Sequence, residues 1–486
     1  MSYMDASPHS GQVPLVVDLD GTLTPADVTL EAMVRYARGG LMNLLRVLLW
    51  MLKGRAVLKA MLARQAPLDA AALHLRPEVV ALIEGARAEG RPVILASASH
   101  SRNIARAARH SGLFDQVLAT RRRANLKGTA KLAALRALGV QEFDYVGDSR
   151  ADAPLWAASR RAYTVRHLPR ASAVERLCAP PRPPWRALLK AMRPHQWAKN
   201  GLVFVPVLTA GLATNAAALA QAALAAFLFS LLASGVYLLN DVLDIDADRA
   251  HAVKSRRPLA SGDLSIPAAL AASALLTILP MAAAFALLGA GFGSVLAIYL
   301  GLTAAYSFRL KAVMALDAVT LACLYTIRIV AGAAAISVPL SFWLLTFSVF
   351  LFLSLAYLKR YTELAAAIRP AAELLKGRGY TRGDLDIVAM SGISAGMVSI
   401  LVLALFIQAV GSDPAYAAPQ LLWPICLMLL YWINRVWLMA RRGEVEGDPV
   451  AFAVKDPRSL VLGALMAACF LAAQSVPLKW GNGLIL

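Results

Sequence analysis

The chain has few charged residues for its length: only 16% of its 486 residues are Asp, Glu, Lys or Arg, whereas 58% are hydrophobic. Soluble domains average roughly 25% charged residues, so the composition argues against a wholly soluble protein and favours a membrane protein of two or more domains. The charge that is present is mostly positive, with a formal net charge of +19. We attribute this excess to cytoplasmic loops and anionic lipid, and we expect no nucleic acid partner.

Cysteine is also scarce, since the chain has 4, at Cys178, Cys323, Cys426 and Cys469. They are scattered and show no CxxC spacing, so neither a disulfide framework nor a zinc site is indicated. The first residues, MSYMDASPHSGQV, lack the basic start and apolar centre of a signal peptide. We therefore expect the N-terminus to stay in the cytoplasm.

The first part of the chain, residues 1–170, alternates short β-type runs with helical stretches. The runs PLVVDLD, RPVILAS and EFDYVGD each end in polar residues, which is typical of an α/β domain with a parallel sheet. The Pro-rich segment APPRPPW then predicts a break in regular structure, and we assign residues 171–192 to a linker and an amphipathic helix. That helix either lies at the membrane surface or is an ordinary soluble connector.

The rest of the chain, residues 193–486, is a series of apolar segments of spanning length, which predicts an all-α polytopic membrane bundle. We expect about nine spans, near residues 200–214, 217–239, 267–288, 292–308, 313–335, 340–358, 388–410, 419–439 and 459–478. The loops expected outside contain no Lys or Arg, and the inner loops are rich in both. The sequence thus predicts a multi-pass protein of the inner (cytoplasmic) membrane, with its N-terminal domain and active sites on the cytoplasmic side and its C-terminus outside.

The soluble part contains a set of residues suited to phosphate chemistry. Asp18 and Asp20 follow the first β-type run in DLDGT; at this spacing both carboxylates can enter one pocket, where one attacks phosphorus and the other protonates the leaving oxygen. Ser97 ends the second run, and Lys127 lies in NLKGTAK. The last run leads into VGDSRAD, which contains Asp148 and Asp152.

This order of motifs resembles the haloacid-dehalogenase-like phosphohydrolases, whose fold is Rossmann-like with a helical cap. The resemblance implies that Asp18 is the nucleophile, that Asp20 is the general acid and base, and that Ser97 and Lys127 bind the transferring phosphoryl group. It also implies a Mg²⁺ site among the carboxylates Asp18, Asp20, Asp148 and Asp152. The metal and the lysine would offset the charge of the phosphate during in-line transfer.

The stretch between the first two motifs, about residues 24–90, is too long for a loop, and we expect it to form the helical cap. Within it, LMNLLRVLLWML (41–52) is unusually apolar for a soluble domain but too short to span a membrane. Two interpretations remain open. The segment is a buried cap helix, or it docks on the membrane and brings the phosphatase to a lipid-borne substrate.

The membrane part contains the acidic stretch NDVLDIDAD after the second predicted span. On a helix, the spacing of Asp241, Asp244 and Asp248 puts their side chains on one face, while Asp246 points elsewhere. Three carboxylates on one face would repel one another without a cation. Mg²⁺ is bound in proteins by one or two carboxylates plus substrate phosphates. The pattern predicts a Mg²⁺–diphosphate site with Asn240 as a hydrogen-bonding neighbour; the alternative is a solvated acidic loop.

The NDxxDxxxD pattern resembles the UbiA-type intramembrane prenyltransferase superfamily, whose members transfer a group away from a Mg²⁺-bound diphosphate. The second DxxxD motif of the aromatic prenyltransferases is missing, because Leu321 stands where an Asp would follow Asp317. The segments RPHQWAKN, YSFRLK, TIRIVAG and YLKRYTEL instead resemble the decaprenyl-phosphate phosphoribosyltransferase branch. This branch transfers 5-phosphoribosyl from phosphoribosyl diphosphate (PRPP) to a polyprenyl phosphate.

Because both of these substrates are polyanions, we expect several cations near the metal. The resemblance implies that Lys254 and Arg257 contact PRPP phosphates and that Tyr361 and Glu363 contact ribose hydroxyls. The candidates for binding the 5-phosphate or the lipid phosphate are Lys199, Arg309, Lys311, Arg328, Lys359 and Arg360. For each cation, the alternative is an ordinary positive charge of an inner loop.

Phosphoribosyl transfer leaves a 5-phosphate on the lipid-linked ribose, and we hypothesise that the N-terminal domain removes it to give polyprenylphosphoryl-ribose. One alternative is a prenyltransferase that joins an isoprenyl diphosphate to an aromatic or lipid acceptor, with a phosphatase domain of separate function. The missing DxxxD motif and the added cations argue against it. A second alternative, a transporter or scaffold, lacks the internal repeat that many transporters show. Assembly into a homo-oligomer is left open.

Overall fold

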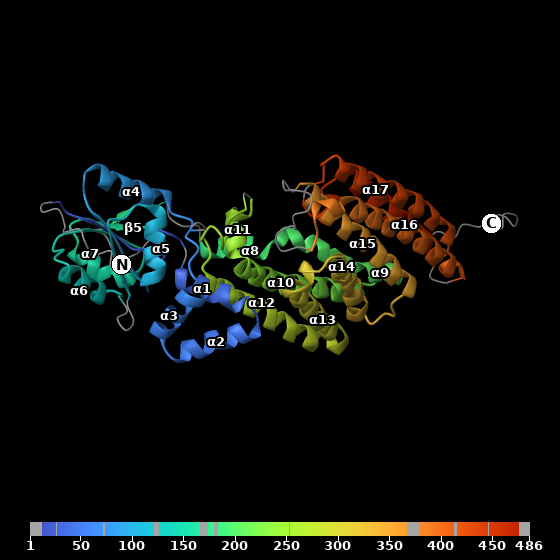
Figure 1. Cartoon of the computed structure of the whole chain (residues 1–486). Helices are drawn as coiled ribbons and strands as arrows, with labels where there is room; N and C mark the ends of the chain where they lie inside the picture. Colours follow the sequence, from blue (N-terminus) through green and yellow to red (C-terminus); the bar gives the residue numbers. More distant parts are fainter. Residues whose placement is uncertain are drawn as a thin grey trace. The chain divides into compact units, whose positions relative to one another are not determined.

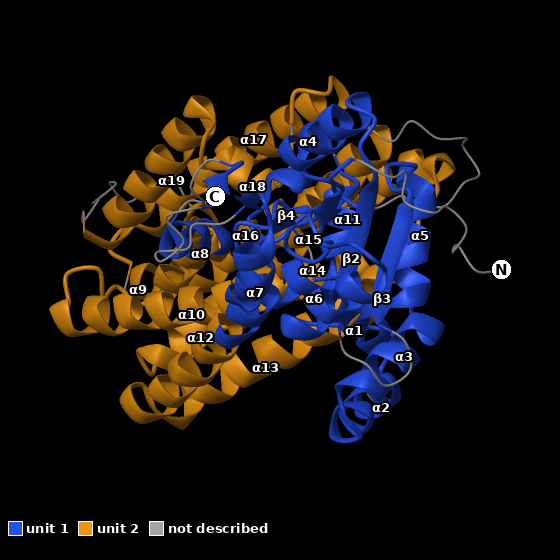
Figure 2. Ribbon diagram, turned by 90° about the vertical axis from the view of Figure 1, so that its left-hand side faces the viewer, with its two compact units in different colours: residues 1–191, 238–271 blue, residues 192–237, 272–486 orange. Residues whose placement is uncertain are grey.

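The computed structural model describes residues 12–25, 27–70, 73–120, 126–165, 174–178, 183–251, 253–366, 379–412, 416–445 and 447–475. The chain forms two compact units, one of residues 1–191 and 238–271 and the other of residues 192–237 and 272–486 (Figure 2). The first unit therefore contains the predicted soluble domain together with the segment that carries the acidic motif. We predicted that this segment would pack with the membrane domain.

The soluble domain is built on a parallel sheet with helices around it, among them α4, α5, α6 and α7 (Figure 1). Within the described residues, its strands lie in the order β3-β2-β1-β4-β5-β6. The strands are β1 Leu15–Val17, β2 Val93–His100, β3 Gln116–Thr120, β4 Asp144–Gly147, β5 Ala162–Thr164 and β6 Glu175–Arg176. The three predicted runs are the adjacent strands β2, β1 and β4. The sheet continues into β6, beyond the boundary predicted at residue 170.

Helices cover both faces of this sheet, because side chains alternate between the faces along each strand. Leu15 and Val17 belong to the core under α4 (Pro77–Ala88) and α5 (Ser101–Ser111). Val16 belongs to the core on the other face, with α6 (Thr129–Ala137) and α7 (Ala153–Ala158). Because the sheet is parallel, the residues that follow β1, β2 and β4 meet at one edge.

The cap consists of α1 (Val28–Ala37), α2 (Leu41–Leu52) and α3 (Arg55–Gln65), which share a small core of their own around Leu58 and Leu62. We predicted a cap over residues 24–90. The later part of that range forms α4, whose Val79 and Ile83 pack on the sheet. The cap is therefore shorter than predicted.

Helix α2 exposes most of its large apolar side chains. Only Val47 and Trp50 are buried among those described, and Leu52 is 85% exposed. The exposed side chains are Met42, Leu44, Leu45, Leu48, Leu49, Met51 and Leu52. The interpretation of this segment as a buried cap helix is therefore wrong for most of its surface, and docking on a membrane stays a hypothesis.

Within the described residues, 8 helices are long and apolar enough to cross a membrane. They are α10 Ala216–Leu243, α12 Ile266–Leu287, α13 Gly289–Phe308, α14 Leu316–Ala335, α15 Phe342–Ala365, α16 with its preceding turn Arg382–Ala409, α17 with its preceding turn Pro419–Arg441, and α19 Pro457–Ser475. These helices match eight of the predicted spans. The C-terminal residues 476–486 lie outside the described part.

The first predicted span, near residues 200–214, is not a spanning helix. It comprises the 3-10 helix η2 (Pro194–Phe204) and the short helix α9 (Val205–Thr209). Pro206 lacks an N–H for helical hydrogen bonding, and Gly211 has a φ of +70° that ends the helical path. We counted nine spans where the described residues provide 8, so the argument from an odd number for an outer C-terminus has no basis.

In the second unit, α14 lies between two groups of helices and packs against both. Ile327 belongs to a core shared with α10 and α13, and Ile329 belongs to a core shared with α15 and α17. Gly332 lets the backbone of η2 approach α14, since a Cβ there would lie 2.1 Å from the carbonyl oxygen of Val203. Residues of α14 are thus held in place on both sides.

A buried carboxylate at the start of β4 provides a test of the soluble fold away from its polar edge. Asp144 is fully buried and accepts hydrogen bonds from Arg91 and from Arg160, whose Nε lies 3.1 Å from Asp144 Oδ1. We predict that Asp144→Ala lowers the free energy of unfolding of this domain by about 3 kcal/mol, because it leaves arginines without their partner. Thermal unfolding in detergent measures the loss. The exposed Glu142→Ala serves as control, and equal midpoints for the two variants contradict the assignment.

Candidate active sites

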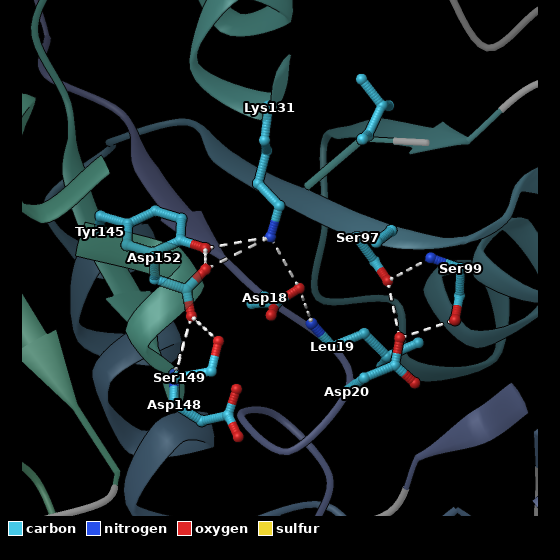
Figure 3. A network of polar contacts seen from close by, with 12 residues as sticks. Asp18, Leu19, Asp20, Ser97, Ser99, Lys131, Tyr145, Asp148, Ser149 and Asp152 are labelled. Atoms are coloured by element: carbon cyan, nitrogen blue, oxygen red, sulfur yellow. Dashed lines mark hydrogen bonds and ion pairs between the residues drawn. The ribbon is translucent and has the colours of Figure 1, made fainter. Parts of the chain in front are cut away.

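The polar residues at the carboxyl edge of the sheet form two neighbouring groups of contacts, one around Asp18 and Asp152 and one around Asp20 (Figure 3). The Nζ of Lys131 lies 3.0 Å from Oδ1 of Asp18 and 3.8 Å from Oδ1 of Asp152, and it donates to the hydroxyl of Tyr145 at 3.0 Å. Lys131 is buried in the first turn of α6. Its position beside the predicted nucleophile is the one in which an ammonium offsets negative charge on a phosphoryl group.

We predicted Lys127 for this role, but the structure puts Lys131 beside Asp18. Lys127 precedes α6 and is exposed, although it lines the same cavity. Both lysines lie in the heptapeptide NLKGTAK, so the motif alone does not separate them. The difference arises from the start of α6, because helical side chains tilt toward the N-terminus of their helix, which here directs Lys131 toward the strand ends.

Two serines hold the second carboxylate of DLDGT. The hydroxyls of Ser97 and Ser99 donate to Oδ2 of Asp20 at 3.0 and 2.7 Å, and the N–H of Val28 donates to Oδ1 at 2.9 Å. Ser97 was predicted as a phosphoryl ligand, and its hydroxyl is here directed at Asp20. Ser99 was not predicted, although its place two residues further along the same strand put it on the same face.

Three of the predicted metal ligands converge. Within the described residues, ligand oxygens of Asp18, Asp148 and Asp152 all lie within 4.8 Å of one another. Asp20 is outside this group. The set fits Mg²⁺, which prefers carboxylate oxygens. Gly21 leaves room for the Asp148 carboxylate: Gly21 has a φ of +78°, and a Cβ there would lie 2.2 Å from Oδ2 of Asp148.

Asp152 is positioned by its own hydrogen bonds. One of its oxygens, Oδ2, accepts from the N–H and hydroxyl of Ser149 at 3.1 and 3.0 Å, and the other accepts from Tyr145 at 2.8 Å. Burial raises the pKa of Asp18 to about 7, although the Lys131 ammonium acts in the opposite direction. A divalent cation at these carboxylates would favour the ionised form of Asp18, which is the form that can act as a nucleophile.

The acidic motif does not form one continuous helix. Helix α10 ends at Leu243 and α11 (Ile245–Arg249) follows, with Asp244 between them. Asp241 and Asp248 are buried and share the Nη1 of Arg257, at 3.1 and 2.5 Å. Asp241 and Asp248 therefore lie near the same cation, but they belong to two helices and not to one helical face as predicted. Two facing carboxylates that already share one cation are a donor set that fits Mg²⁺ as well.

The other two carboxylates of the motif contact the cap, within the same unit. Asp244 lies 3.3 Å from Nη2 of Arg38, and Asp246 accepts two hydrogen bonds from Arg35, at 2.8 and 2.9 Å. We predicted Asp244 on the face of the other two. The break between α10 and α11 turns it instead toward Arg38. Of the remaining predicted residues here, Asn240 is partly buried at the end of α10 and Lys254 is exposed on the 3-10 turn Lys254–Arg256.

In the second unit, two predicted cations share one carboxylate. The Nζ of Lys199 lies 2.7 Å from Oδ2 of Asp448, and the Nζ of Lys359 lies 3.5 Å from the same oxygen. The hydroxyl of Tyr325 also contacts Asp448, at 3.2 Å. We missed Asp448 in the sequence. The signal that could have found it is GDPV, in which an Asp precedes a proline at the start of a helix, here α18 (Pro449–Ala453).

Arg328 is a third predicted cation of this region, buried on α14. Its Nε donates to Oδ1 of Asn200 at 2.9 Å. Its guanidinium lies 5.1 to 5.5 Å from the ring centres of Phe229, Tyr299 and Tyr325. The Nζ of Lys199 lies 5.6 Å from the centre of the same Tyr325 ring, so Arg328 and Lys199 both contact that ring.

Arg360 has a different environment from its neighbour Lys359. It is buried, its Nε lies 2.6 Å from Oδ2 of the fully buried Asp317, and it also pairs with Glu363. The other oxygen of Asp317 accepts a hydrogen bond from the hydroxyl of Tyr380 at 2.7 Å. This network joins α14 to α15 and gives Arg360 and Glu363 packing partners, where we predicted contacts with substrate.

The remaining predicted residues lie near the helix ends. Tyr361 makes an edge contact with the ring of Trp437, with 5.8 Å between ring centres. Arg309 is exposed at the end of α13, and Lys311 is partly buried in the 3-10 turn Leu310–Ala312. None of these contacts by itself assigns a role.

Comparison with known proteins identifies both parts of the chain. Residues 202–454 match the UbiA prenyltransferase family, and residues 15–157 match the haloacid dehalogenase-like hydrolases. The chain belongs to the UbiA prenyltransferase family. It carries a haloacid dehalogenase-like hydrolase domain at its N-terminus, so it is an enzyme of this family fused to a hydrolase domain.

The relatives differ in how much of this chain they cover. The uncharacterized protein y4nM of Sinorhizobium fredii is 34% identical over 98% of this chain and 93% of its own length. The nodulation protein NoeC of Azorhizobium caulinodans is 38% identical over 59% of this chain and 94% of its own. The decaprenyl-phosphate phosphoribosyltransferase of Mycobacterium tuberculosis is 36% identical over 57% of this chain and 90% of its own.

The two lysines of NLKGTAK can be separated by experiment. We predict that Lys131→Met lowers kcat/KM for hydrolysis of p-nitrophenyl phosphate about 100-fold, because a charge that stabilises the transferring phosphoryl group is lost. Lys127→Met, which removes an exposed lysine, is expected to cost less than about tenfold. The measurement is a steady-state assay of the full chain in detergent, and a larger loss for Lys127→Met contradicts the placement of Lys131.

The Asp317–Arg360 pair is predicted to stabilise the UbiA bundle. Asp317→Asn leaves a buried guanidinium without its charge partner and is expected to lower the free energy of unfolding by about 3 kcal/mol. The control is Asp386→Asn, because Asp386 is exposed on α16. Thermal unfolding in detergent compares the two; if Asp317→Asn unfolds with the control, the pair contributes no stability.

Proposed function

We propose that the UbiA part of the chain transfers 5-phosphoribosyl from PRPP to a polyprenyl phosphate and releases diphosphate. The observation that carries the proposal is a group of three cations in the second unit: Lys199 and Lys359 share the carboxylate Asp448, and the buried Arg328 lies beside the ring of Tyr325, which Lys199 also contacts. An excess of positive charge among apolar helices is costly unless an anion binds there. The mycobacterial relative, named decaprenyl-phosphate phosphoribosyltransferase, supports the same substrate class.

The acidic motif supplies the other part of the chemistry. Asp241 and Asp248 would hold Mg²⁺ with the diphosphate of PRPP, and Mg²⁺ would neutralise that diphosphate as it leaves. Arg257 pairs with both carboxylates and would pair with a diphosphate oxygen instead when the metal binds. The anomeric carbon loses the diphosphate and gains the oxygen of the lipid phosphate, so one C–O bond breaks as another forms.

We further propose that the hydrolase domain removes the 5-phosphate from this product. The carboxylate of Asp18 attacks phosphorus, and Asp20 protonates the departing 5-oxygen of the ribose. Asp20 then takes a proton from water, which attacks the aspartyl phosphate and releases inorganic phosphate. Lys131 and the Mg²⁺ held by Asp18 and Asp148 would offset the phosphoryl charge.

The proposed substrates place the enzyme at a lipid surface. The polyprenyl phosphate reaches it within the bilayer, and the 8 candidate spans of the described residues are consistent with that source. The cytoplasmic orientation of both sites and the inner membrane as the location stay predictions.

Isotope transfer tests the donor. The full chain in lipid nanodiscs is given polyprenyl phosphate with labelled PRPP or, separately, with a labelled isoprenyl diphosphate. We expect label in lipid only from PRPP, and no transfer after chelation of Mg²⁺ with EDTA. Incorporation of the isoprenyl label instead would support a conventional prenyltransferase.

Single substitutions separate the two proposed steps. Asp248→Asn is expected to lower pentose transfer at least about 100-fold because it removes a metal ligand, with Asp263→Asn in the same segment as control. Asp18→Asn is expected to leave transfer intact and to accumulate the 5-phosphorylated lipid. Mass spectrometry of the extracted lipid distinguishes the products, and identical products from wild type and Asp18→Asn would refute the dephosphorylation step.

A further inference from the structure

The hydrolase site opens into a cavity of about 700 Å³ within the first unit. This volume is in the range of sites for whole organic ligands, roughly 300 to 1,000 Å³, and is much larger than one phosphate needs. The cavity has three walls: the carboxyl edge of the sheet, the cap helices, and the segment 245–267 that follows the acidic motif. Carboxylates line the catalytic edge, whereas the cap contributes basic residues and the third wall contributes mostly apolar ones.

The cap side of the cavity gathers positive charge. Arg55 and Lys59 of α3 line it together with Lys127. Burial lowers the pKa of Lys59, the carboxylates Asp20 and Asp27 raise it, and the charges of Lys127 and Arg55 lower it by smaller amounts. Lys59 donates to the carbonyl oxygen of Ala98 at 2.7 Å. Like charges placed together in a cavity repel one another, and a bound anion relieves that repulsion.

The nearby carboxylates of the cap are already occupied. Asp27 caps α1 by accepting from two backbone N–H groups at 3.0 Å. Glu31 pairs with Arg249 at 2.7 Å, and both side chains are buried. In the described part of the chain, neither Arg55 nor Lys127 forms an ion pair, so their charges are available to an anion other than the phosphate at Asp18.

The third wall is apolar. Leu259, Leu264 and Ile266 line the cavity, as do the cap residues Met33 and Met51. Two ion pairs, Glu31–Arg249 and Arg35–Asp246, fix this segment against α1. Met51 also belongs to α2, so the apolar lining is continuous with the exposed apolar surface of that helix.

We propose that this cavity binds a lipid-linked substrate with two phosphates: a phosphomonoester at Asp18, a phosphodiester at Arg55, Lys59 and Lys127, and the first part of a hydrocarbon chain on the apolar wall. The inference rests on the proposed function and specifies its second step. A small phosphomonoester at Asp18 would leave Arg55, Lys127 and the apolar wall without a contact to substrate. The product of pentose transfer carries a phosphate at each end of the ribose, with the lipid attached to one of them.

Three substrates separate the contributions of the second phosphate and the lipid. The full chain in nanodiscs is assayed with ribose 5-phosphate, with ribose 1,5-bisphosphate, and with the 5-phosphoribosyl polyprenyl phosphate accumulated by Asp18→Asn. Arg55→Ala is expected to lower kcat/KM about tenfold more for the two substrates with two phosphates than for ribose 5-phosphate, which is the effect of one charge-assisted contact. Met51→Gln is expected to penalise the lipid substrate alone.

Arg64→Ala is the matched control, because Arg64 is exposed on the same helix α3 and does not line the cavity. Pentose transfer by each variant reports whether the chain is folded. An equal loss of kcat/KM for all three substrates, or no loss, overturns the proposal. Either outcome leaves the Asp18→Asn product analysis unaffected, so failure of this inference is distinguishable from failure of the proposed dephosphorylation.

Discussion

Among the described residues, several buried carboxylates lie beside a cation, and this pairing recurs in both units. Without partners such groups would cost several kcal/mol each. Asp18 has Lys131, Asp241 and Asp248 share Arg257, and Asp317 has Arg360. Where the cation only pairs with the carboxylate, as in Asp317–Arg360, the ion pair joins two helices. Where a metal ion or a phosphate can replace the cation or bind beside it, the same arrangement can serve as a binding site.

Each of the two proposed sites needs a bound ion to balance its charge, and the two ions have opposite signs. At Asp18, Asp148 and Asp152, carboxylates gather and a divalent cation completes the site. Around Asp448, cations gather and phosphate groups would complete it. The segment that follows the acidic motif packs within the first unit and walls the hydrolase cavity. The proposed transferase motif and one wall of the hydrolase cavity therefore lie on one continuous piece of chain, which would give the fusion of the two domains a physical basis.

Features set by local pattern could be predicted from the sequence. Strands β1, β2 and β4, the positions of Asp18, Asp20, Ser97, Asp148 and Asp152 at strand ends, and eight of the spans depend on short hydrophobic runs and the residues that end them. These predictions required no knowledge of distant parts of the chain.

Features set by tertiary contacts could not be predicted. Lys131 replaced Lys127 beside Asp18 because of where α6 begins, and Asp244 turned to Arg38 because the helix breaks there. Asp448 meets Lys199 across 249 positions of sequence, which no local motif reveals. The composition of α2 is compatible with a core helix. Its burial, however, depends on how much of the cap packs over it, and most of its large apolar side chains are exposed.

The central claim is that two sites of one chain act in sequence on one lipid. The most direct measurement is a time course by mass spectrometry of the lipids formed by the wild-type chain in nanodiscs from PRPP and polyprenyl phosphate. The account predicts that a 5-phosphoribosyl lipid appears first and is converted to polyprenylphosphoryl-ribose, with one inorganic phosphate released for each conversion. A lipid that never gains a pentose, or a phosphorylated product that persists as the end point, contradicts it.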